Sequence, residues 1–239
     1  MPPEISIVVP VHNEAGAAGP LAREIAEAFA GRDYEMVFVD DASRDATLQE
    51  LLALRGELPR LRVLKHPKNA GQSRAVRTGV LAARGSVVVT LDGDGQNPPA
   101  DGPTLAEALL AAPAEIAMIG GRRIKRQDSA AKRWASRIAN GVRKRLLGDD
   151  ADDTGCGLKA FRRDAFLRLP YFDHMHRYLP ALMIREGYLV RYQDVGHRPR
   201  VVGRSKYTNL GRLWAAVSDL QGVMWLKSRA RNPGAVEEL

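Results

Sequence analysis

The stretch Val87-Val88-Val89-Thr90-Leu91-Asp92-Gly93-Asp94-Gly95-Gln96 decides the fold of this chain and points to its chemistry. Its β-branched and leucine residues predict a fully buried strand. Side chains two residues apart in extended backbone point the same way, so Asp92 and Asp94 would direct two carboxylates to one point beyond the strand. Paired oxygen ligands favour Mg²⁺ or Mn²⁺. The alternative is an ordinary Asp-Gly turn, but the position directly after a buried strand favours the metal.

Other apolar runs alternate with helical patterns on both sides of this stretch. Such alternation on short connections predicts an α/β fold, a mostly parallel sheet with helices on both faces. Ligands of open α/β sheets bind at the carboxyl ends of strands, where the clusters His12-Asn13-Glu14 and Asp40-Asp41 also fall. The predicted strands are 5–11, 36–39, 61–64, 87–91, 115–121, 158–161 and 188–192. The predicted helices lie around 21–29, 45–52, 134–146, 178–184 and 210–224, and a further one follows the segment 69–73 and runs to about Ala83.

Composition and motifs narrow the function classes. A single cysteine, Cys156, excludes an internal disulfide and a cysteine-rich zinc site, which suits a reducing, cytoplasmic setting. The first strand begins at Ile5, so no secretory signal is expected, and no apolar run is long enough to span a bilayer. No glycine-rich dinucleotide fingerprint and no Walker loop follow the first strand. The net charge of +8 favours anionic partners: nucleic acid, acidic lipid or phosphorylated substrates.

Two later segments are basic. The first runs from Arg122 to Arg145 and contains the predicted amphipathic helix 134–146. Its basic side chains form either a solvated face or a surface for phosphate or anionic membrane. The second, 197–206, is a basic loop with a glycine hinge, suited to closing over an anion. Beyond it, the apolar stripe 210–224 suits a helix that lies in a membrane interface or docks on a partner. We expect one domain over residues 1–206 and a C-terminal amphipathic helix and tail over 207–239.

Four motifs in order resemble the family 2 glycosyltransferases. They are Pro10-x-x-Asn13-Glu14, Asp40-Asp41-x-Ser43, Asp92-x-Asp94-x-Gln96 and Arg200-x-x-Gly203-x-Ser205-Lys206. More narrowly, the basic loop and the segment His176-Arg177-Tyr178-Leu179-Pro180 are similar to the dolichyl-phosphate mannose synthases and their bacterial polyprenyl-phosphate relatives. The resemblance runs from about Ile5 to Arg231 and implies a GT-A-like nucleotide-binding fold.

The resemblance also implies roles for individual residues. Asp92, Asp94 and Gln96 would bind Mg²⁺ or Mn²⁺ and, through it, the donor diphosphate. Arg122 and Arg200 would act with the two aspartates in catalysis. Residues that would hold the nucleotide-sugar, besides Gln96, are Pro10, His12, Glu14, Asp40, Asp41 and Arg133. Residues that would bind the acceptor phosphate are Arg200, Ser205 and Lys206.

The implied reaction is inverting transfer of a sugar from a nucleotide-sugar, GDP-mannose or similar, to a polyprenyl or dolichyl phosphate. A phosphate nucleophile is already ionised and needs no strong general base, whereas a hydroxyl acceptor needs one, for which Asp152 or Asp153 is a candidate. We expect a cytoplasmic protein peripherally associated with the cytoplasmic membrane. The alternatives are a family 2 enzyme with a soluble or polysaccharide acceptor and, ranked low, a non-catalytic membrane- or nucleic-acid-binding module; no nucleic-acid motif is present. Sugar, nucleotide, lipid length and oligomeric state stay open.

Overall fold

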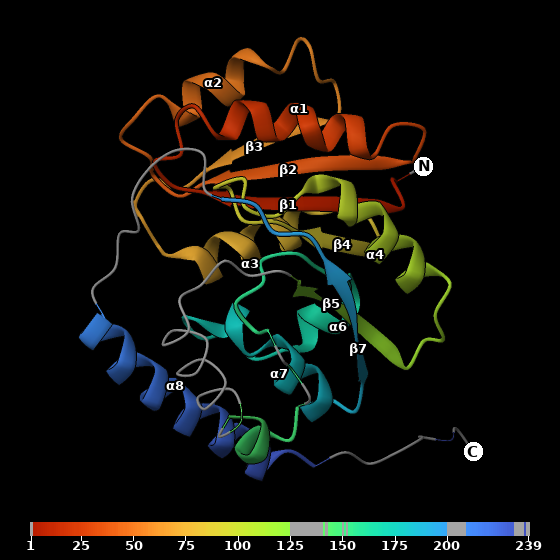
Figure 1. The fold of residues 1–239 in the computed structure, drawn as a ribbon, viewed down its shortest axis with the longest axis vertical. Helices are drawn as coiled ribbons and strands as arrows, with labels where there is room; N and C mark the ends of the chain where they lie inside the picture. The colour runs from red at the N-terminus through yellow and green to blue at the C-terminus, as the bar shows by residue number, and fades with distance from the viewer. Residues whose placement is uncertain are drawn as a thin grey trace.

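The computed structural model describes residues 2–124, 141, 143–149, 151, 153–199, 209–231 and 237, with the backbone alone over 209–216. Within this part the chain forms a seven-stranded sheet in the order β3-β2-β1-β4-β6-β5-β7 (Figure 1). The strands are β1 Ile5–Val11, β2 Tyr34–Asp40, β3 Leu61–Lys65, β4 Val87–Thr90, β5 Ile116–Arg123, β6 Lys159–Arg162 and β7 Leu189–Val195. Of these seven, only β6 runs antiparallel to its neighbours.

Helices cover both faces of the sheet. The α-helices are α1 Ala18–Ala28, α2 Thr47–Ala53, α3 Gln72–Ala82, α4 Gly102–Leu110, α6 Arg163–Arg168, α7 Leu179–Arg185 and α8 Asn209–Arg229, and the short 3-10 turns are η1 Pro99–Asp101 and η2 Met175–Arg177. Successive side chains of β1 alternate between faces: Ile7 and Val9 pack with α1 and α4, whereas Val8 packs with α3. The predicted mostly parallel α/β sheet is confirmed.

The sheet reverses its strand order between β1 and β4. From β1 the chain moves outward through β2 and β3, and it returns to the other side of β1 with β4. This is the topological switch point at which open α/β sheets bind ligands. Pro10 of β1 and the turn that starts at Asp92 lie on the two sides of it, so the two acidic residues of the deciding stretch stand at the expected crevice.

Helix α8 docks on the domain instead of projecting one apolar stripe outward. Val223 is fully buried, and the half-buried Leu220 and Leu226 pack beside it on the core under α7. Val217, Met224 and Trp225 remain exposed. The predicted helix is present, but its described apolar side chains, from Val217 onward, divide into an inward set and an outward set. None of the helices in the described part of the chain has the length and apolar character needed to cross a bilayer.

Candidate functional site

Asp92 lies two residues beyond the end of β4 and is held from two sides. Its Oδ1 accepts a hydrogen bond of 2.7 Å from Nε2 of Gln72, at the start of α3. Its carboxylate also lies against the Cα of Gly157, so closely that an ideal Cβ on that glycine would fall 2.6 Å from Oδ1. Burial, and then the neighbouring charge of Asp94, raise the pKa of Asp92 above its ordinary value. The two carboxylates of the deciding stretch are therefore close enough to repel each other.

The turn Gly93–Gln96 is tied down around these acids. The backbone N–H of Gln96 donates to Oδ1 of Asp94 at 3.1 Å, and Gly95 takes a left-handed φ of 72°. Gly93 has room for no side chain, because a Cβ would meet the carbonyl oxygen of Pro10 at 2.8 Å. The turn is thus packed against the end of β1.

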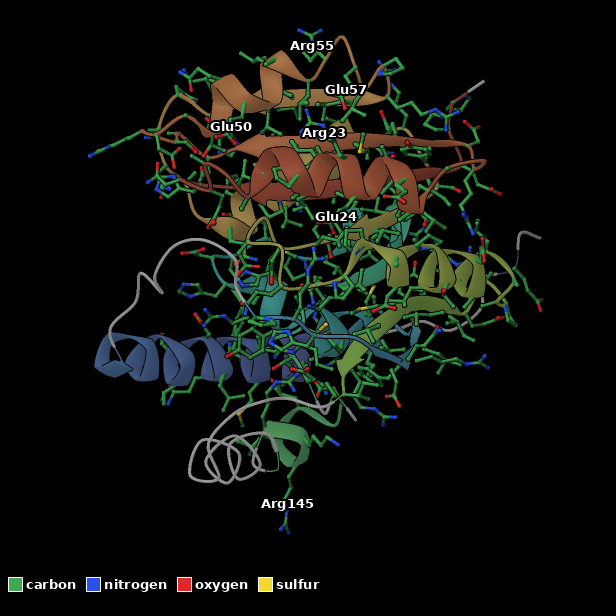
Figure 2. All side chains as sticks on the ribbon, turned by 45° about the horizontal axis from the view of Figure 1, so that its top comes forward. Arg23, Glu24, Glu50, Arg55, Glu57 and Arg145 are labelled. Atoms are coloured by element: carbon green, nitrogen blue, oxygen red, sulfur yellow. The ribbon has the colours of Figure 1, made fainter. Side chains whose placement is uncertain are left out.

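Arg198 holds the turn Gly93–Gln96 from its outer side through hydrogen bonds. Its Nε donates to the carbonyl oxygen of Gly95 at 2.5 Å, and its backbone N–H donates to the carbonyl oxygen of Gln96 at 3.0 Å. Its guanidinium also pairs with Glu24 of α1 at 2.7 Å; Figure 2 labels Glu24 on that helix. The segment that leaves β7 is therefore fastened to the acidic turn.

A cavity of about 350 Å³ opens beside Asp92. The carboxyl ends of β1 and β4 supply one part of its lining, the segment before β6 a second, and η2 a third. Its lining residues are Pro10, Gln72, Val76, Thr90, Leu91, Asp92, Thr154, Gly155, Cys156, Gly157, Lys159, His176, Arg177 and Leu179. A space of this size matches the lower end of small-molecule sites.

Lys159 brings a buried positive charge to this cavity. It pairs in register with Thr90 across β4 and β6, is 6% exposed, and donates a hydrogen bond from Nζ to the carbonyl oxygen of Cys156. Burial lowers the pKa of Lys159, and the nearby Cys156 and Asp92 act in the opposite direction. The site thus combines a carboxylate pair with an ammonium group in a water-poor setting, where charges interact strongly.

The two arginines of β5 lie in different surroundings, because successive side chains of a strand project from opposite faces of the sheet. Arg122 forms an exposed ion pair with Asp194 of β7 at 2.6 Å and is not part of the cavity lining. Its neighbour Arg123 holds Asp153 with Nε–Oδ2 and Nη2–Oδ1 hydrogen bonds of 2.7 Å each, and its charge acts on Asp92. The role predicted for Arg122 stays a prediction, and Arg123 is the arginine of this strand whose charge reaches the acids. Its pairing also makes Asp153 a poor general base.

A second cavity, of about 520 Å³, lies beyond the ends of β1, β2 and β3. Its lining combines a histidine ring with amides and cationic side chains: His12, Asn13, Ala42, Ser43, Arg44, Lys65, Pro67, Lys68 and Asn69. Nδ1 of His12 donates to the carbonyl oxygen of Asp41 at 2.8 Å, and its Nε2 accepts from Nδ2 of Asn13 at 3.1 Å. These bonds place the ring in the lining.

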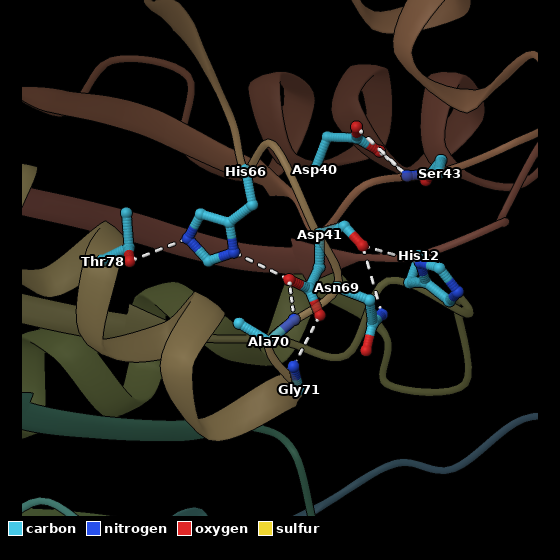
Figure 3. A network of polar contacts seen from close by, with 9 residues as sticks. All are labelled: His12, Asp40, Asp41, Ser43, His66, Asn69, Ala70, Gly71 and Thr78. Carbon is cyan, nitrogen blue, oxygen red and sulfur yellow. Dashed lines mark hydrogen bonds and ion pairs between the residues drawn. The ribbon is translucent and has the colours of Figure 1, made fainter.

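Asp41 serves as an internal anchor (Figure 3). Its Oδ1 accepts hydrogen bonds from His66 at 2.7 Å and from the N–H of Ala70 at 2.8 Å, and its Oδ2 accepts from the N–H of Gly71 at 2.8 Å. Nδ2 of Asn69 donates to its backbone carbonyl at 3.2 Å. A carboxylate has about four acceptor positions, so this side chain is largely committed to holding the start of α3.

Other predicted nucleotide residues are placed as follows. Asp40 is fully buried and accepts from the N–H of Ser43 at 3.3 Å. Glu14 is half-buried, and its N–H donates to the hydroxyl of Thr47 at 2.8 Å. Pro10 lines the cavity beside Asp92. The predicted Arg133, Arg200, Ser205 and Lys206, and the alternative base Asp152, lie outside the described residues.

The sequence reasoning missed several site residues, among them Gln72, Gly157, Lys159 and Arg198. The signal for Gln72 was its place in the polar segment 69–73, between the third predicted strand and the helix that follows it. Gly157 and Lys159 lie next to and within the predicted strand at 158–161, which was read for packing and not for charge. Nothing local in the sequence pairs Arg198 with Gly95, because that contact joins segments 103 residues apart.

The paired acids fit a divalent cation. Asp92 and Asp94 repel each other in a partly buried setting, and a cation between them would remove that repulsion. In the described part of the chain no group of three or more His, Cys, Asp or Glu side chains is arranged to hold a metal. The remaining ligands would therefore come from water, Gln96 or a bound phosphate, as is usual for Mg²⁺.

Comparison with known proteins agrees with the geometry. The sequence profile of glycosyl transferase family 2 matches residues 6–169. The dodecaprenyl-phosphate galacturonate synthase of Rhizobium johnstonii is 32% identical over 236 residues, which are 97% of this chain and 69% of that protein. The undecaprenyl-phosphate 4-deoxy-4-formamido-L-arabinose transferase of Pseudomonas aeruginosa is 36% identical over 223 residues, 90% of this chain and 63% of that protein.

Solved structures share the fold. The glucosyl-3-phosphoglycerate synthase of Mycobacterium tuberculosis, determined with Mg²⁺ and UDP, superposes with a TM-score of 0.69 at 19% identity, over 97% of this chain and 82% of that one. The same enzyme has been determined with Mn²⁺, UDP and glucosyl-3-phosphoglycerate. The expected GT-A-like architecture is confirmed. With the profile covering more than half of its length, the chain belongs to glycosyl transferase family 2.

Proposed function

We propose that this chain transfers a sugar from a nucleotide-sugar donor to a polyprenyl monophosphate. The observation that carries the proposal is the cavity beside Asp92, where this carboxylate and the cations Lys159 and Arg177 line one space at the switch point of the sheet. Two relatives that span most of this chain are named for sugar transfer involving dodecaprenyl and undecaprenyl phosphate. Because this chain matches only 69% and 63% of their lengths, its activity is inferred and not carried over from them.

The donor would bind across both cavities. Its nucleoside would occupy the cavity beside His12, Asn13 and Lys68, and Asp41 would support the wall of that cavity from inside. Pro10, Glu14, Asp40 and Arg133 complete the proposed nucleotide set. Mg²⁺ or Mn²⁺ held by Asp92, Asp94 and Gln96 would neutralise negative charge on the departing diphosphate.

The chemistry requires little proton transfer. An oxygen of the acceptor phosphate would attack the anomeric carbon, and the bond from that carbon to the nucleoside diphosphate would break, with its electron pair leaving on the diphosphate. Direct displacement inverts the anomeric centre. A phosphate monoester is largely ionised at neutral pH, so no strong base is needed. The commitment of Asp153 to Arg123 supports this reading over a hydroxyl acceptor.

A lipid acceptor requires a surface that meets the membrane, and we propose that α8 supplies it. Met224 and Trp225 are exposed near the end of the helix, beside the exposed Arg229. Arg145 projects away from the body of the protein (Figure 2). Exposed apolar side chains with adjacent cations suit the interface of an anionic bilayer. The division into a domain over 1–206 and a C-terminal helix over 207–239 is also a proposal. Val223 of that helix packs in the core of the domain.

Membrane association can be tested with matched variants. Replacing Met224 and Trp225 together by serine should weaken binding to vesicles that contain phosphatidylglycerol by about tenfold or more, since they are the two largest exposed apolar side chains in the described part of α8. Leu189→Ser is the control, because Leu189 is 59% exposed on β7, away from α8. Equal sedimentation of the double variant and the control with vesicles would remove the proposed surface.

Sugar transfer is tested directly. The protein with Mn²⁺ is incubated with UDP- and GDP-linked hexoses and uronic acids and with a short-chain polyprenyl phosphate, and lipid-linked sugar is measured. The expected result is transfer to the polyprenyl phosphate and none to the corresponding alcohol. Transfer to free sugars or glycans, with no lipid-linked product from any donor, would replace the proposal with the soluble-acceptor alternative.

A further inference from the structure

The turn η2 is clamped from two sides before it reaches the cavity. His174 takes a left-handed φ of 64°, and its Nδ1 lies 2.9 Å from Oδ2 of Asp219 on α8. Two residues later, Nδ1 of His176 and Oγ of Ser73 share a hydrogen bond of 2.7 Å, and the N–H of His176 donates to the same hydroxyl at 3.3 Å. Helices α3 and α8 therefore fix the turn, and the next side chain, Arg177, lies in the lining of the cavity.

Arg177 presents unused donors to that cavity. It is half-buried, and among the described residues its guanidinium forms no hydrogen bond or ion pair. The other cationic arginines near the acids are committed: Arg123 to Asp153, and Arg198 to Glu24 and Gly95. A guanidinium has five N–H donors in a fork that matches a phosphate. An arginine held in place without a partner is suited to binding an anion that enters the cavity.

Lys159 adds a second charge to the same lining. Its Nζ has three donors, of which one is used by the carbonyl oxygen of Cys156. His176 adds none, because burial lowers its pKa well below the ordinary value and keeps the ring neutral. The lining is therefore divided: the end of β4 contributes carboxylate, whereas η2 and β6 contribute two cations.

The two parts of the lining suit two different phosphate groups, a diphosphate and a phosphate monoester. A diphosphate approaching Asp92 and Asp94 needs a metal to offset the carboxylate charge, whereas a phosphate beside Arg177 and Lys159 needs none. A monoester carries a charge of about −1.5 to −2 at neutral pH, which two cations balance. We propose that Arg177 and Lys159 bind the phosphate monoester of the acceptor, with Arg177 as the forked ligand and Lys159 as the buried counter-charge. The assignment rests on the proposed function, and it makes both residues binding residues of the acceptor.

Binding without turnover tests this assignment. Calorimetric titration measures the affinity for farnesyl monophosphate, for inorganic phosphate and, with Mn²⁺ present, for UDP and GDP. The variants are Arg177→Gln, Arg177→Lys and, as the matched control, Arg168→Gln, which removes an exposed arginine from α6. Thermal melting checks that each protein folds.

The expected result is specific to the monoester. Arg177→Gln weakens farnesyl monophosphate binding by about tenfold or more, the scale of a lost hydrogen bond to a charged group, and changes the affinity for the nucleoside diphosphate less than twofold. The farnesyl monophosphate affinity of Arg177→Lys lies between those of wild type and Arg177→Gln, since an ammonium lacks the paired N–H donors of a guanidinium. The affinity of Arg168→Gln matches that of wild type. Inorganic phosphate competes with farnesyl monophosphate in wild type and does so much more weakly in Arg177→Gln.

Three results would overturn the assignment. They are farnesyl monophosphate affinity within twofold of wild type in Arg177→Gln, an equal loss of nucleoside diphosphate affinity in that variant, and no binding of farnesyl monophosphate by the wild-type protein. The proposed function fails separately. If no donor yields lipid-linked sugar while Arg177→Gln still loses the monoester, the phosphate site stands and the transfer reaction does not.

Discussion

Replacing Gly157 by alanine tests whether the Asp92 carboxylate must lie where the structure places it. The added Cβ would fall 2.6 Å from Oδ1, and closer still to Cγ and Oδ2, whereas ordinary contact begins at 3.4 Å. The nearest carboxylate atom, Oδ2, would have to retreat by about 1.2 Å, the difference between 3.4 and 2.2 Å. That movement also strains the 2.7 Å hydrogen bond from Gln72.

The expected loss of activity follows from this displacement. Misplacing a catalytic constellation by about 1 Å can lower a rate about 100-fold, so we expect Gly157→Ala to lower sugar transfer by about that factor. The free energy of unfolding should fall by only about 1–3 kcal/mol, the usual range for a tight insertion, which is about 2–12 °C in Tm for a chain of this size. The measurements are transfer rate at saturating Mn²⁺, Mn²⁺ affinity and thermal melting.

Gly56→Ala is the control for the same chemical change. A Cβ on Gly56 meets nothing within 4 Å, so this variant should keep wild-type activity. A folded Gly157→Ala protein that transfers sugar within threefold of the wild-type rate would refute the placement of Asp92 against the glycine. If Gly157→Ala is inactive because it unfolds at the assay temperature, repeating the assay below its Tm distinguishes this from inactivity of the folded protein.

Three further predictions test separate features. Asp94→Asn should lower the pKa of Asp92, because the Asp94 charge contributes to raising it, and should reduce transfer by at least about 10- to 100-fold; NMR titration and the transfer assay check these. Burial raises the pKa of Asp149 to about 6 in the folded protein, against 3.8 for the ordinary group, so the folded state holds this proton more tightly. Its contribution to stability is therefore greatest below about pH 4 and is lost as pH rises through 6, by up to about 3 kcal/mol. Urea unfolding of wild type and Asp149→Asn across pH 4–7.5 should show that this loss of unfolding free energy with rising pH is present in wild type and absent from the variant. The same pH dependence of unfolding free energy in both proteins would contradict the prediction. Gly222→Ala, in the exposed interior of α8 with open space around it, should stabilise the protein by about 0.5–1 kcal/mol, and a lowered Tm would show that the helix is not formed there.

Much of the fold could be predicted because the buried strands carry continuous apolar runs. Each predicted strand is present, with ends shifted by a few residues, and the acidic turn stands at the sheet edge. Helix α4 was not predicted, although Leu105, Ala106 and Leu109 have helical spacing. The antiparallel direction of β6 was also not foreseen, because strand direction depends on long-range pairing and not on local pattern.

The site residues could be predicted where polar side chains follow a predicted strand in the sequence. They could not be predicted where a contact joins segments that are far apart in the sequence. Asp92 and Asp94 follow from a local rule of alternation. The pairing of Arg123 with Asp153, in place of a free acid near residue 153, depends on how β5 lies beside the segment before β6. Likewise the division of α8 into inward and outward apolar side chains requires knowledge of the surface on which Val223 packs.

The anchoring of Asp41 has a consequence for how sequence comparisons of this family should be interpreted. Asparagine would lose an acceptor facing a backbone N–H, and glutamate would place its oxygens one carbon too far from the donors at Ala70 and Gly71. Natural selection would therefore retain this aspartate in proteins that bind different nucleotides, or none. If Asp41 were invariant, this would reflect its role in the structure of the ligand-free protein. It would not identify Asp41 as a residue that recognises the donor.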